Sequence, residues 1–134
     1  MLTEEEKKRL AQRMVVEVWG QGKVGVVDEI VGEDYVEYMV NHSLEIRGRK
    51  DLKDLIKAFH EVIPKFVKYI ENTTVSNEAV IVHYSEMRSN IDPNARIQGV
   101  VIYGFSNGKI VEGIDIRNSY DIIRDSIFTR VAEE

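Results

Sequence analysis

The sequence contains no cysteine among its 134 residues. That absence excludes disulfides, catalytic thiolates and zinc sites built on cysteine, and it is compatible with a reducing cytosol. No apolar run approaches the roughly 20 residues that a helix needs to cross a bilayer. The first residues, Met1 to Glu6, are acidic where a secretory signal would be basic and then apolar. We therefore expect a cytoplasmic protein that is not embedded in a membrane.

A surplus of basic residues is also missing. Lysine and arginine number 18 against 23 aspartates and glutamates, which gives a formal net charge of -5. The basic residues are scattered among acids, as in the run from Glu4 to Arg9, and form no stripe that could bind phosphates. We expect no nucleic-acid partner.

The residues that a metal site or a phosphate-binding or serine-nucleophile site would need are also missing. The three histidines have no metal-ligand spacing and none pairs with a close carboxylate on one helix face, so we expect no metal. No glycine-rich phosphate loop and no nucleophilic serine elbow is present. We therefore expect a protein without a cofactor.

The residues that are present suit a small globular domain. Hydrophobic residues make up 43% and charged residues 31% of the chain, a balance that supplies enough apolar mass for a core. A chain of this length fits one domain, and no repeat, linker or low-complexity stretch divides it. We assign residues 1–134 to a single domain.

Helical spacing of apolar residues marks the first half of the chain. A capping box at Thr3 and Glu6 begins a helix that Gly20–Gly22 ends. A shorter helix is predicted at 24–31, and a third follows Gly48 and ends before Pro64. Two more elements are predicted by their patterns: a short strand at 35–40 and a last helix from about Ser119 to Val131.

The second half, from Lys65 to Asn118, is typical of strands. Asn107 and Gly108 stand between two β runs, and this pair is the strongest short-range signal for a hairpin. The predicted runs lie near 67–75, 80–84, 100–105 and 110–116. Because the helices cluster before this meander instead of alternating with strands, the order predicts an α+β fold.

That order resembles the nuclear-transport-factor-2-like superfamily, and the local sequence is most similar to its SnoaL-like (polyketide ester cyclase) branch. Three stretches carry the resemblance: Asp34-Tyr35-Val36 through Asn41-His42, a strand ending in histidine; Gly48-Arg49-Lys50-Asp51-Leu52 through Phe59 and Pro64, a glycine-led helix ending in proline; and Asn107-Gly108-Lys109-Ile110-Val111-Glu112, a hairpin before the last strand.

The resemblance implies a cone-shaped, curved antiparallel sheet packed with N-terminal helices around one apolar pocket. It also implies a homodimer formed through the sheet. Enzymes of this superfamily hold one or two acid–base groups in a dry cavity, so we expect a cofactor-independent isomerase, cyclase or hydrolase. Its substrate would be a small apolar carbonyl or epoxide compound. A non-catalytic small-molecule-binding protein and a dimeric interaction module of the same fold are the alternatives.

Two departures from the branch count against ester-cyclase activity, and the one at Asn118 favours the small-molecule-binding protein. The last strand of the branch typically reads Glu-x-Trp-x-x-x-Asp, whereas Ile114 and Asn118 occupy the Trp and Asp positions here. Arg88-Ser89-Asn90 stands where the branch has a Gly-Thr-His step. Asn118 lacks a titratable group, and it could instead cap the last helix.

An acid–base pocket needs a carboxylate or histidine whose pKa burial has moved toward neutrality, with a donor for the developing oxyanion. His42 stands where the branch places a histidine, and it is either a base or substrate-orienting donor, or a loop residue bonded to backbone. His83 points either into the cavity or to the outer face of its strand. His60 is expected at the surface.

The last strand offers Asp115, which is either desolvated in the pocket or paired in solvent with Arg117. Strict alternation groups Glu112 with the more apolar face of that strand. Alternation alone therefore favours Glu112 or Asn118 as the residue that faces the cavity.

Glu86 and Arg88 share one face of their strand. If that face lines the cone, Glu86 could be the base and Arg88 could hold an anionic group with two hydrogen bonds; otherwise they form a solvated pair. Tyr38, Tyr103 and Trp19 are suited to lining a pocket and donating one hydrogen bond, or to simple core packing.

Overall fold

The computed structural model describes residues 1–40, 44–63, 66–88 and 92–117. The expected last helix, together with His42 and Asn118, lies outside these residues. The elements follow one another as α1 (Glu4–Arg13), the π-helical segment η1 (Met14–Gly20), α2 (Gly25–Ile30), β1 (Val31–Met39), β2 (Leu44–Arg47), α3 (Gly48–Val62), β3 (Phe66–Val75), β4 (Ala79–Arg88), β5 (Asp92–Ser106) and β6 (Lys109–Arg117).

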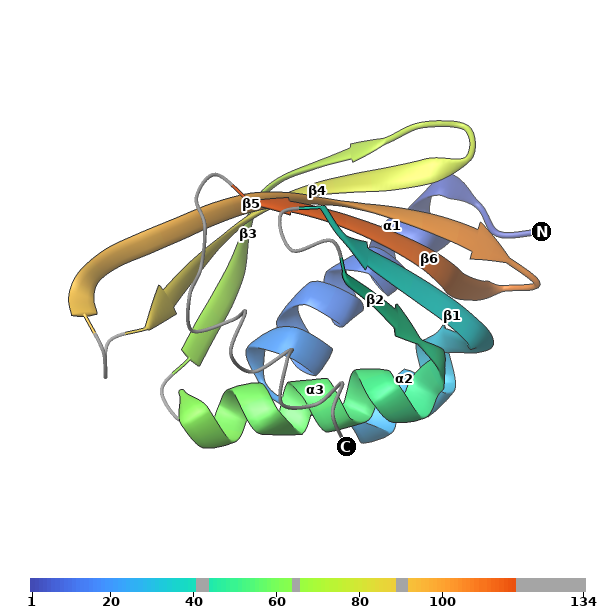
Figure 1. The fold of residues 1–134 in the computed structure, drawn as a ribbon. Helices are drawn as coiled ribbons and strands as arrows, with labels where there is room; N and C mark the ends of the chain where they lie inside the picture. The colour runs from blue at the N-terminus through green and yellow to red at the C-terminus, as the bar shows by residue number, and fades with distance from the viewer. Residues whose placement is uncertain (41–43, 64–65, 89–91, 118–134) are drawn as a thin grey trace.

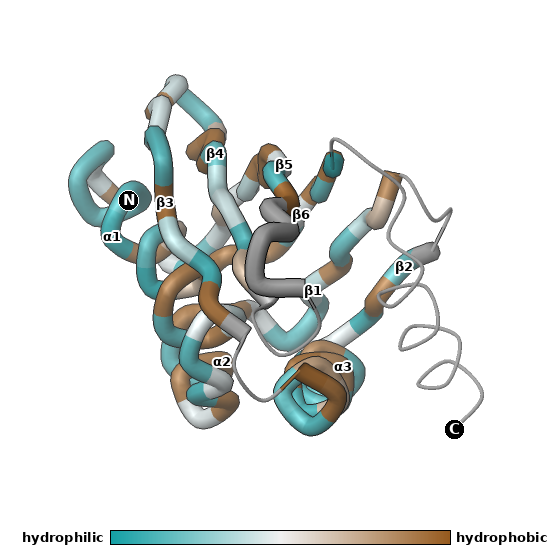
Figure 2. Tube along the Cα trace, turned by 90° about the vertical axis from the view of Figure 1, so that its left-hand side faces the viewer, coloured by the Kyte–Doolittle hydropathy of each residue, from teal (hydrophilic) through white to brown (hydrophobic). Residues whose placement is uncertain are grey.

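The six strands form one sheet in the order β2-β1-β6-β5-β4-β3. Neighbouring strands run antiparallel except β1 and β6, which are parallel. The sheet curves over the helices, which all lie on one side of it (Figure 1). Figure 2, turned by 90°, shows α2 and α3 beneath the arched row of strands from β3 to β2. The predicted α+β fold with a curved sheet is confirmed, and the parallel pair is the one departure from the antiparallel pattern.

The first helix begins as its capping box predicts. The Glu6 amide donates to the Thr3 hydroxyl at 3.1 Å, and the Thr3 amide donates to the Glu6 carboxylate at 3.0 Å. The helix then widens into η1 before Gly20, where Nε2 of His60 lies 2.7 Å from the Trp19 carbonyl oxygen. His60 is therefore half-buried between α3 and η1, and the expectation that it lies at the surface is wrong.

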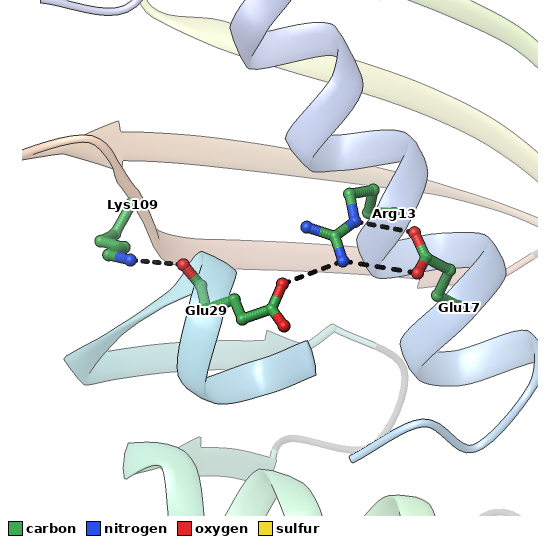
Figure 3. Close-up of polar contacts among 4 residues, drawn as sticks. All are labelled: Arg13, Glu17, Glu29 and Lys109. Carbon is green, nitrogen blue, oxygen red and sulfur yellow. Dashed lines mark hydrogen bonds and ion pairs between the residues drawn. The ribbon is translucent and has the colours of Figure 1, made fainter. Parts of the chain in front are cut away.

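Ion pairs on the outside of the molecule join α1, η1 and α2. Arg13 donates to the Glu17 carboxylate at 2.8 Å and to the Glu29 carboxylate at 3.0 Å (Figure 3). The Lys109 ammonium, at the start of β6, donates to the Glu29 backbone carbonyl. Partly exposed pairs of this kind contribute about 1 kcal/mol or less each, so they orient the elements more than they stabilise them.

Local signals located the other predicted elements of the described residues, but β5 begins at Asp92, well before the predicted run near 100–105. Asn107 and Gly108 have φ angles of 52° and 77°, as the predicted two-residue hairpin requires. The second helix ends at Ile30 instead of residue 31, because Val31 already begins β1. The short strand β2 was not predicted.

The hydrophobic core fills the space between the sheet and the helices. Trp19 of η1 packs edge-on against Phe59 of α3, with ring centroids 5.7 Å apart. The largest fully buried apolar side chains from the helices are Met14, Ile30, Leu52, Leu55, Ile56 and Phe59. Helix α3 packs on β1 and β2, while α1 and η1 pack on β3 and β4. The helices thereby enclose the inner face of the sheet.

A β-bulge near the start of β6 changes which residues face inward. Glu112 pairs with Gly104 on β5, but the next pair is Ile110 with Phe105, so Val111 is an extra residue in β6. An extra residue reverses the alternation of side chains beyond it. Ile110 is buried on one side of the bulge, whereas Asp115 and Arg117 are buried on the other.

Candidate active site

Eight polar or charged side chains gather on the inner face of the sheet, and each is at most 6% exposed. We call them the inner polar cluster. They come from five strands: Tyr35 and Glu37 of β1, Lys68 of β3, Tyr84 and Glu86 of β4, Tyr103 of β5, and Asp115 and Arg117 of β6.

Strand register explains how residues so far apart in sequence meet. One row across the sheet joins Glu37, Gly113 and Tyr103 on neighbouring strands. Another joins Arg117, Gly99 and Tyr84. Directly opposite residues on adjacent strands share a face, so each row delivers polar groups to the same side.

A glycine at the centre of each row makes room for a tyrosine hydroxyl. A Cβ atom at Gly99 would lie 2.4 Å from the Tyr84 hydroxyl oxygen, and one at Gly113 would lie 2.5 Å from that of Tyr35. Because Gly99 has no side chain, the Tyr84 ring crosses β5 and its hydroxyl donates to Asp115 Oδ1 on β6 at 2.5 Å. The two glycines therefore determine which carboxylates the tyrosines can reach.

The carboxyl group of Glu37 is the group most strongly poised for proton transfer. It accepts a hydrogen bond from the Tyr35 hydroxyl at 2.6 Å. Burial, followed by repulsion from the Asp115 carboxylate, raises the pKa of Glu37 to about 7, although Tyr35, Lys68 and Arg117 oppose this rise. A buried carboxyl with a pKa near the working pH can both accept and donate a proton.

Arg117 forms the shortest ion pair of the cluster. Its guanidinium contacts both carboxylate oxygens of Glu86, with one N···O distance of 2.5 Å and the other of 3.0 Å. Its Nε atom lies 3.8 Å from Asp115 Oδ2. Burial alone would lower the pKa of Arg117, but Glu86, Tyr84 and Asp115 outweigh it and raise the pKa further, so this residue stays protonated.

Lys68 brings a second buried cation. Its Nζ atom lies 4.0 Å from the ring centroid of Tyr84 and 5.0 Å from that of Trp19. Burial lowers the pKa of Lys68, with the carboxylates of Glu86 and Asp115 acting against this. Cation–π contacts with these aromatic faces stabilise the charged amine.

The three tyrosines remain protonated hydroxyl donors. Burial, together with nearby carboxylates, raises the pKa of Tyr35, Tyr84 and Tyr103 well above the ordinary value. Neutral phenols next to a titrating carboxyl are suited to stabilising an oxyanion that forms during proton transfer.

The structure brings several of the sequence-predicted residues into or beside this cluster. Glu86, Asp115 and Tyr103 belong to it, and Trp19 covers Lys68. Tyr38 and His83 lie on the outer face of the sheet instead. His42, Asn118 and the side chain of Arg88 lie outside the described part of the chain.

One sequence-based expectation for β6 is wrong, and one open alternative is decided. Glu112, favoured by alternation, is exposed, because the bulge at Val111 reverses the pattern that the prediction assumed. Of the two alternatives for Asp115, the structure shows the desolvated one, since Asp115 and Arg117 are 4% and 6% exposed.

Sequence analysis did not single out four members of the cluster, namely Tyr35, Glu37, Lys68 and Tyr84, and it considered Arg117 only as a solvated partner of Asp115. One signal was available for Glu37. It stands two residues from Tyr35 and two from Met39, so strand alternation gives all three the same face, which is the buried one. No local signal marks Lys68, whose neighbour Val67 is half exposed.

Metal ligation has no geometric basis in the part of the chain that the structure describes. Those residues contain no group of three or more histidine, aspartate or glutamate side chains that could hold a metal ion.

No described helix is long and apolar enough to span a membrane.

Comparison with known proteins identifies relatives of the same fold. The family model for SnoaL-like polyketide cyclase matches residues 9–126. A solved protein from Jannaschia sp. CCS1, described as a candidate SnoaL-like polyketide cyclase, superposes with a TM-score of 0.72 at 18% identity, covering 86% of this chain and 87% of that one.

Two further solved structures show the same architecture. A candidate ketosteroid isomerase from Kribbella flavida has a TM-score of 0.71 at 17% identity, covering 88% of this chain and 82% of its own. An uncharacterised protein with a cystatin-like fold from Silicibacter pomeroyi has a TM-score of 0.69 at 16% identity, covering 93% and 86%. No curated protein matches the chain at a significant level.

Replacing Gly99 tests the packing of the cluster. Gly99→Ala would push a Cβ atom against the Tyr84 hydroxyl and against the Ile116 carbonyl oxygen at 2.9 Å. We expect a loss of about 1–3 kcal/mol in the free energy of unfolding, measured by urea denaturation. Gly104→Ala on the same strand is the matched control, because its Cβ would meet nothing closer than 3.6 Å. Equal effects of the two substitutions would contradict this account.

The raised pKa of Glu37, about 7, predicts a specific dependence of stability on pH. Below pH 4.5, the pKa of Glu37 in the unfolded chain, the carboxyl is protonated in both the folded and the unfolded state. In that range this group makes no contribution to the pH dependence of stability. Between pH 4.5 and about pH 7 only the unfolded chain releases this proton, so the free energy of unfolding falls as pH rises. Above about pH 7 the carboxyl is ionised in both states and the free energy of unfolding falls no further through this group. Relative to the wild type, Glu37→Gln should gain about 3 kcal/mol across that window.

Urea denaturation at a series of pH values measures this difference. Glu33→Gln is the control, since Glu33 lies on the same strand but is exposed. A difference between wild type and Glu37→Gln that stays flat from pH 4.5 to 7 would show that the carboxyl titrates normally.

Proposed function

The chain belongs to the SnoaL-like polyketide cyclase family, and from that premise we propose that it is a cofactor-independent enzyme that uses general acid–base catalysis. Its substrate is a small, mostly apolar carbonyl or epoxide compound, and its reaction is of the isomerase, cyclase or hydrolase type. Fold alone does not assign a reaction, so the inner polar cluster has to carry the argument.

The buried carboxyl of Glu37 is the observation that supports the proposal. It is 2% exposed and its pKa is raised to about 7. At neutral pH a comparable fraction is ionised and protonated, so one side chain can remove a proton and return it elsewhere on the same molecule. Isomerisation of a carbonyl compound requires this pair of transfers.

Removing a proton beside a carbonyl places negative charge on the carbonyl oxygen. The hydroxyls of Tyr35 and Tyr84 now donate to the carboxylates of Glu37 and Asp115. Tyr103 lies in the same row as Glu37 and is kept protonated by burial and by the carboxylates. Because the single O–H of Tyr35 and of Tyr84 is already donated, Tyr103 is the donor that we assign to the developing oxyanion.

Arg117 and Glu86 take a positioning role in this scheme. Their two-point ion pair fixes the guanidinium, which stands 3.8 Å from Asp115. Asp115 in turn is the charged neighbour that raises the pKa of Glu37. A change at Glu86 should therefore alter the pH profile of the reaction more than the binding of substrate.

Glu37→Gln tests the catalytic assignment. A panel of small β,γ-unsaturated ketones in D2O reports proton abstraction through deuterium uptake beside the carbonyl, followed by NMR. The substitution should slow exchange by about 100- to 10,000-fold, the usual contribution of general acid–base catalysis. For the wild type, kcat/KM should rise with pH through about 7, because the base must be ionised.

Glu33→Gln, at an exposed position of the same strand, should leave exchange unchanged. Undiminished exchange in folded Glu37→Gln protein would remove Glu37 from the mechanism.

The alternative function is binding without catalysis. The internal hydrogen bonds from Tyr35 to Glu37 and from Tyr84 to Asp115 favour it, because they give these carboxylates partners within the protein. Thermal stabilisation by members of the ketone panel, with no deuterium uptake on any of them, would favour the binding role over the catalytic one.

We also propose that the protein forms a homodimer through the outer face of the sheet. One row of residues, in register across four strands, presents apolar side chains there: Tyr38, Ile114, Ile102 and Ile81. Ile116 beside this row is 41% exposed and Tyr38 is 37% exposed. A contiguous apolar surface of this kind is typical of an interaction face.

Sedimentation velocity tests the dimer. Ile116→Lys would place a charge within the apolar face and should convert the dimer to a monomer, because an unpaired charge is costly to bury at an interface. Glu78→Lys, an exposed change at the turn between β3 and β4, should leave the dimer intact. A wild-type protein that sediments as a monomer at micromolar concentration would rule out the dimer.

A further inference from the structure

Lys68 occupies an unusual place for a lysine. It lies directly opposite Glu86 in the pairing of β3 with β4, so its side chain shares the inner face of the sheet. Only 5% of the residue is exposed. Its Nζ atom lies over two aromatic rings, at 4.0 Å from the Tyr84 centroid and 5.0 Å from the Trp19 centroid.

The two buried cations of the cluster differ in how they are held. Arg117 makes a two-point ion pair with Glu86. The Lys68 ammonium, by contrast, lies over ring faces, those of Tyr84 and Trp19. Arginine is already the structural cation of this site, so the lysine is available for another role.

The surroundings of Lys68 contain the groups that amine chemistry requires. The charges that act on it are those of Glu86, Asp115, Arg117 and Glu37, while Trp19 and Tyr84 cover it with apolar surface. Burial lowers the pKa of Lys68, which increases the share of free amine at neutral pH. Lysines desolvated in this way next to another cationic group are the ones that act as nucleophiles toward carbonyl carbons.

We propose that the side-chain amine of Lys68 forms an imine with the carbonyl carbon of a small aldehyde or ketone. The inference rests on the proposed function in one respect, namely that the ligand carries a carbonyl group. It adds covalent capture of that ligand to the acid–base chemistry of Glu37.

The step balances without any further reactant. The lone pair of the neutral amine attacks the carbonyl carbon, and the oxygen takes a proton from the protonated carboxyl of Glu37. The nitrogen then releases a proton to a carboxylate of the cluster, and that carboxylate passes the same proton to the hydroxyl, which leaves as water. The nitrogen lone pair closes the C=N bond, so the first product is the protonated imine, with the Glu37 carboxyl left ionised. Amine, carbonyl and the protonated Glu37 carboxyl are thereby converted to a protonated imine, one water molecule and the Glu37 carboxylate, with no change of oxidation state.

The aromatic faces also suit the product. A protonated imine carries its positive charge on the nitrogen that now lies over the rings of Tyr84 and Trp19, so the cation–π contacts of the ammonium persist. An iminium draws electrons from the neighbouring carbon and makes its proton easier to remove. Lys68 would in this way assist the base that we assign to Glu37.

Reductive trapping tests the proposal on the full-length wild-type chain. The protein is incubated at neutral pH with cyclohexanone and sodium cyanoborohydride, and the modified lysines are located by peptide mapping and mass spectrometry. We expect Lys68 to be labelled at least about tenfold faster than Lys57, because burial lowers the pKa of Lys68 and carboxylates lie beside it to transfer protons. Lys57 is exposed on α3 and serves as the internal reference.

Two variants support the assignment. Lys68→Met keeps the length and apolar surface of the side chain and should abolish the fast labelling, with circular dichroism as the check on folding. Lys57→Arg should keep it. Labelling spread evenly over exposed lysines, or no labelling of Lys68 in the wild-type protein, overturns the proposal.

The deuterium-exchange assay separates this inference from the proposed function. Wild-type protein that exchanges protons but is not trapped at Lys68 refutes the imine and leaves the acid–base role of Glu37 intact. Protein that is trapped at Lys68 but exchanges no proton on the ketone panel supports the imine and contradicts the acid–base role.

Discussion

The burial of the Glu37 carboxyl beside that of Asp115 is the constraint on which the site depends. With Lys68 and Arg117 as cations and Glu37, Glu86 and Asp115 as carboxylates, full ionisation would leave one unbalanced negative charge in the cluster. Desolvation makes such a charge costly. Neutralising Glu37 relieves it, in keeping with a pKa raised to about 7 for this carboxyl. The desolvation and charge repulsion that lower the stability of the protein therefore also give it a carboxyl group suited to proton transfer.

The backbone of the sheet makes this arrangement possible. Gly99 on β5 and Gly113 on β6 have no side chain, and the space above them is filled by tyrosines from neighbouring strands, whose hydroxyls can then reach carboxylates. The bulge at Val111 turns Asp115 and Arg117 inward while leaving Glu112 outside. Bulges next to functional sites commonly re-aim a side chain, and here one residue inserted into β6 decides which acid is buried.

How far the sequence predicts this molecule depends on how local each signal is. The capping box at Thr3, the helix α3 and the Asn107-Gly108 hairpin rest on neighbouring residues, and all three were predicted. The inner polar cluster depends on strand register, which brings together residues more than thirty positions apart in the sequence, such as Tyr84 and Asp115. Register and bulges arise from the packing of the whole sheet, so alternation counted along β6 alone selected the wrong acid.

A direct measurement of the Glu37 titration tests the central claim. The side-chain carboxyl carbon of Glu37 can be followed by ¹³C NMR across a pH series, with Glu37→Gln to assign the resonance. The account predicts a midpoint near 7. A midpoint near 4.5, the ordinary value for glutamate, would show that the carboxyl is hydrated or balanced by a cation, and the inner polar cluster would lose its acid–base group.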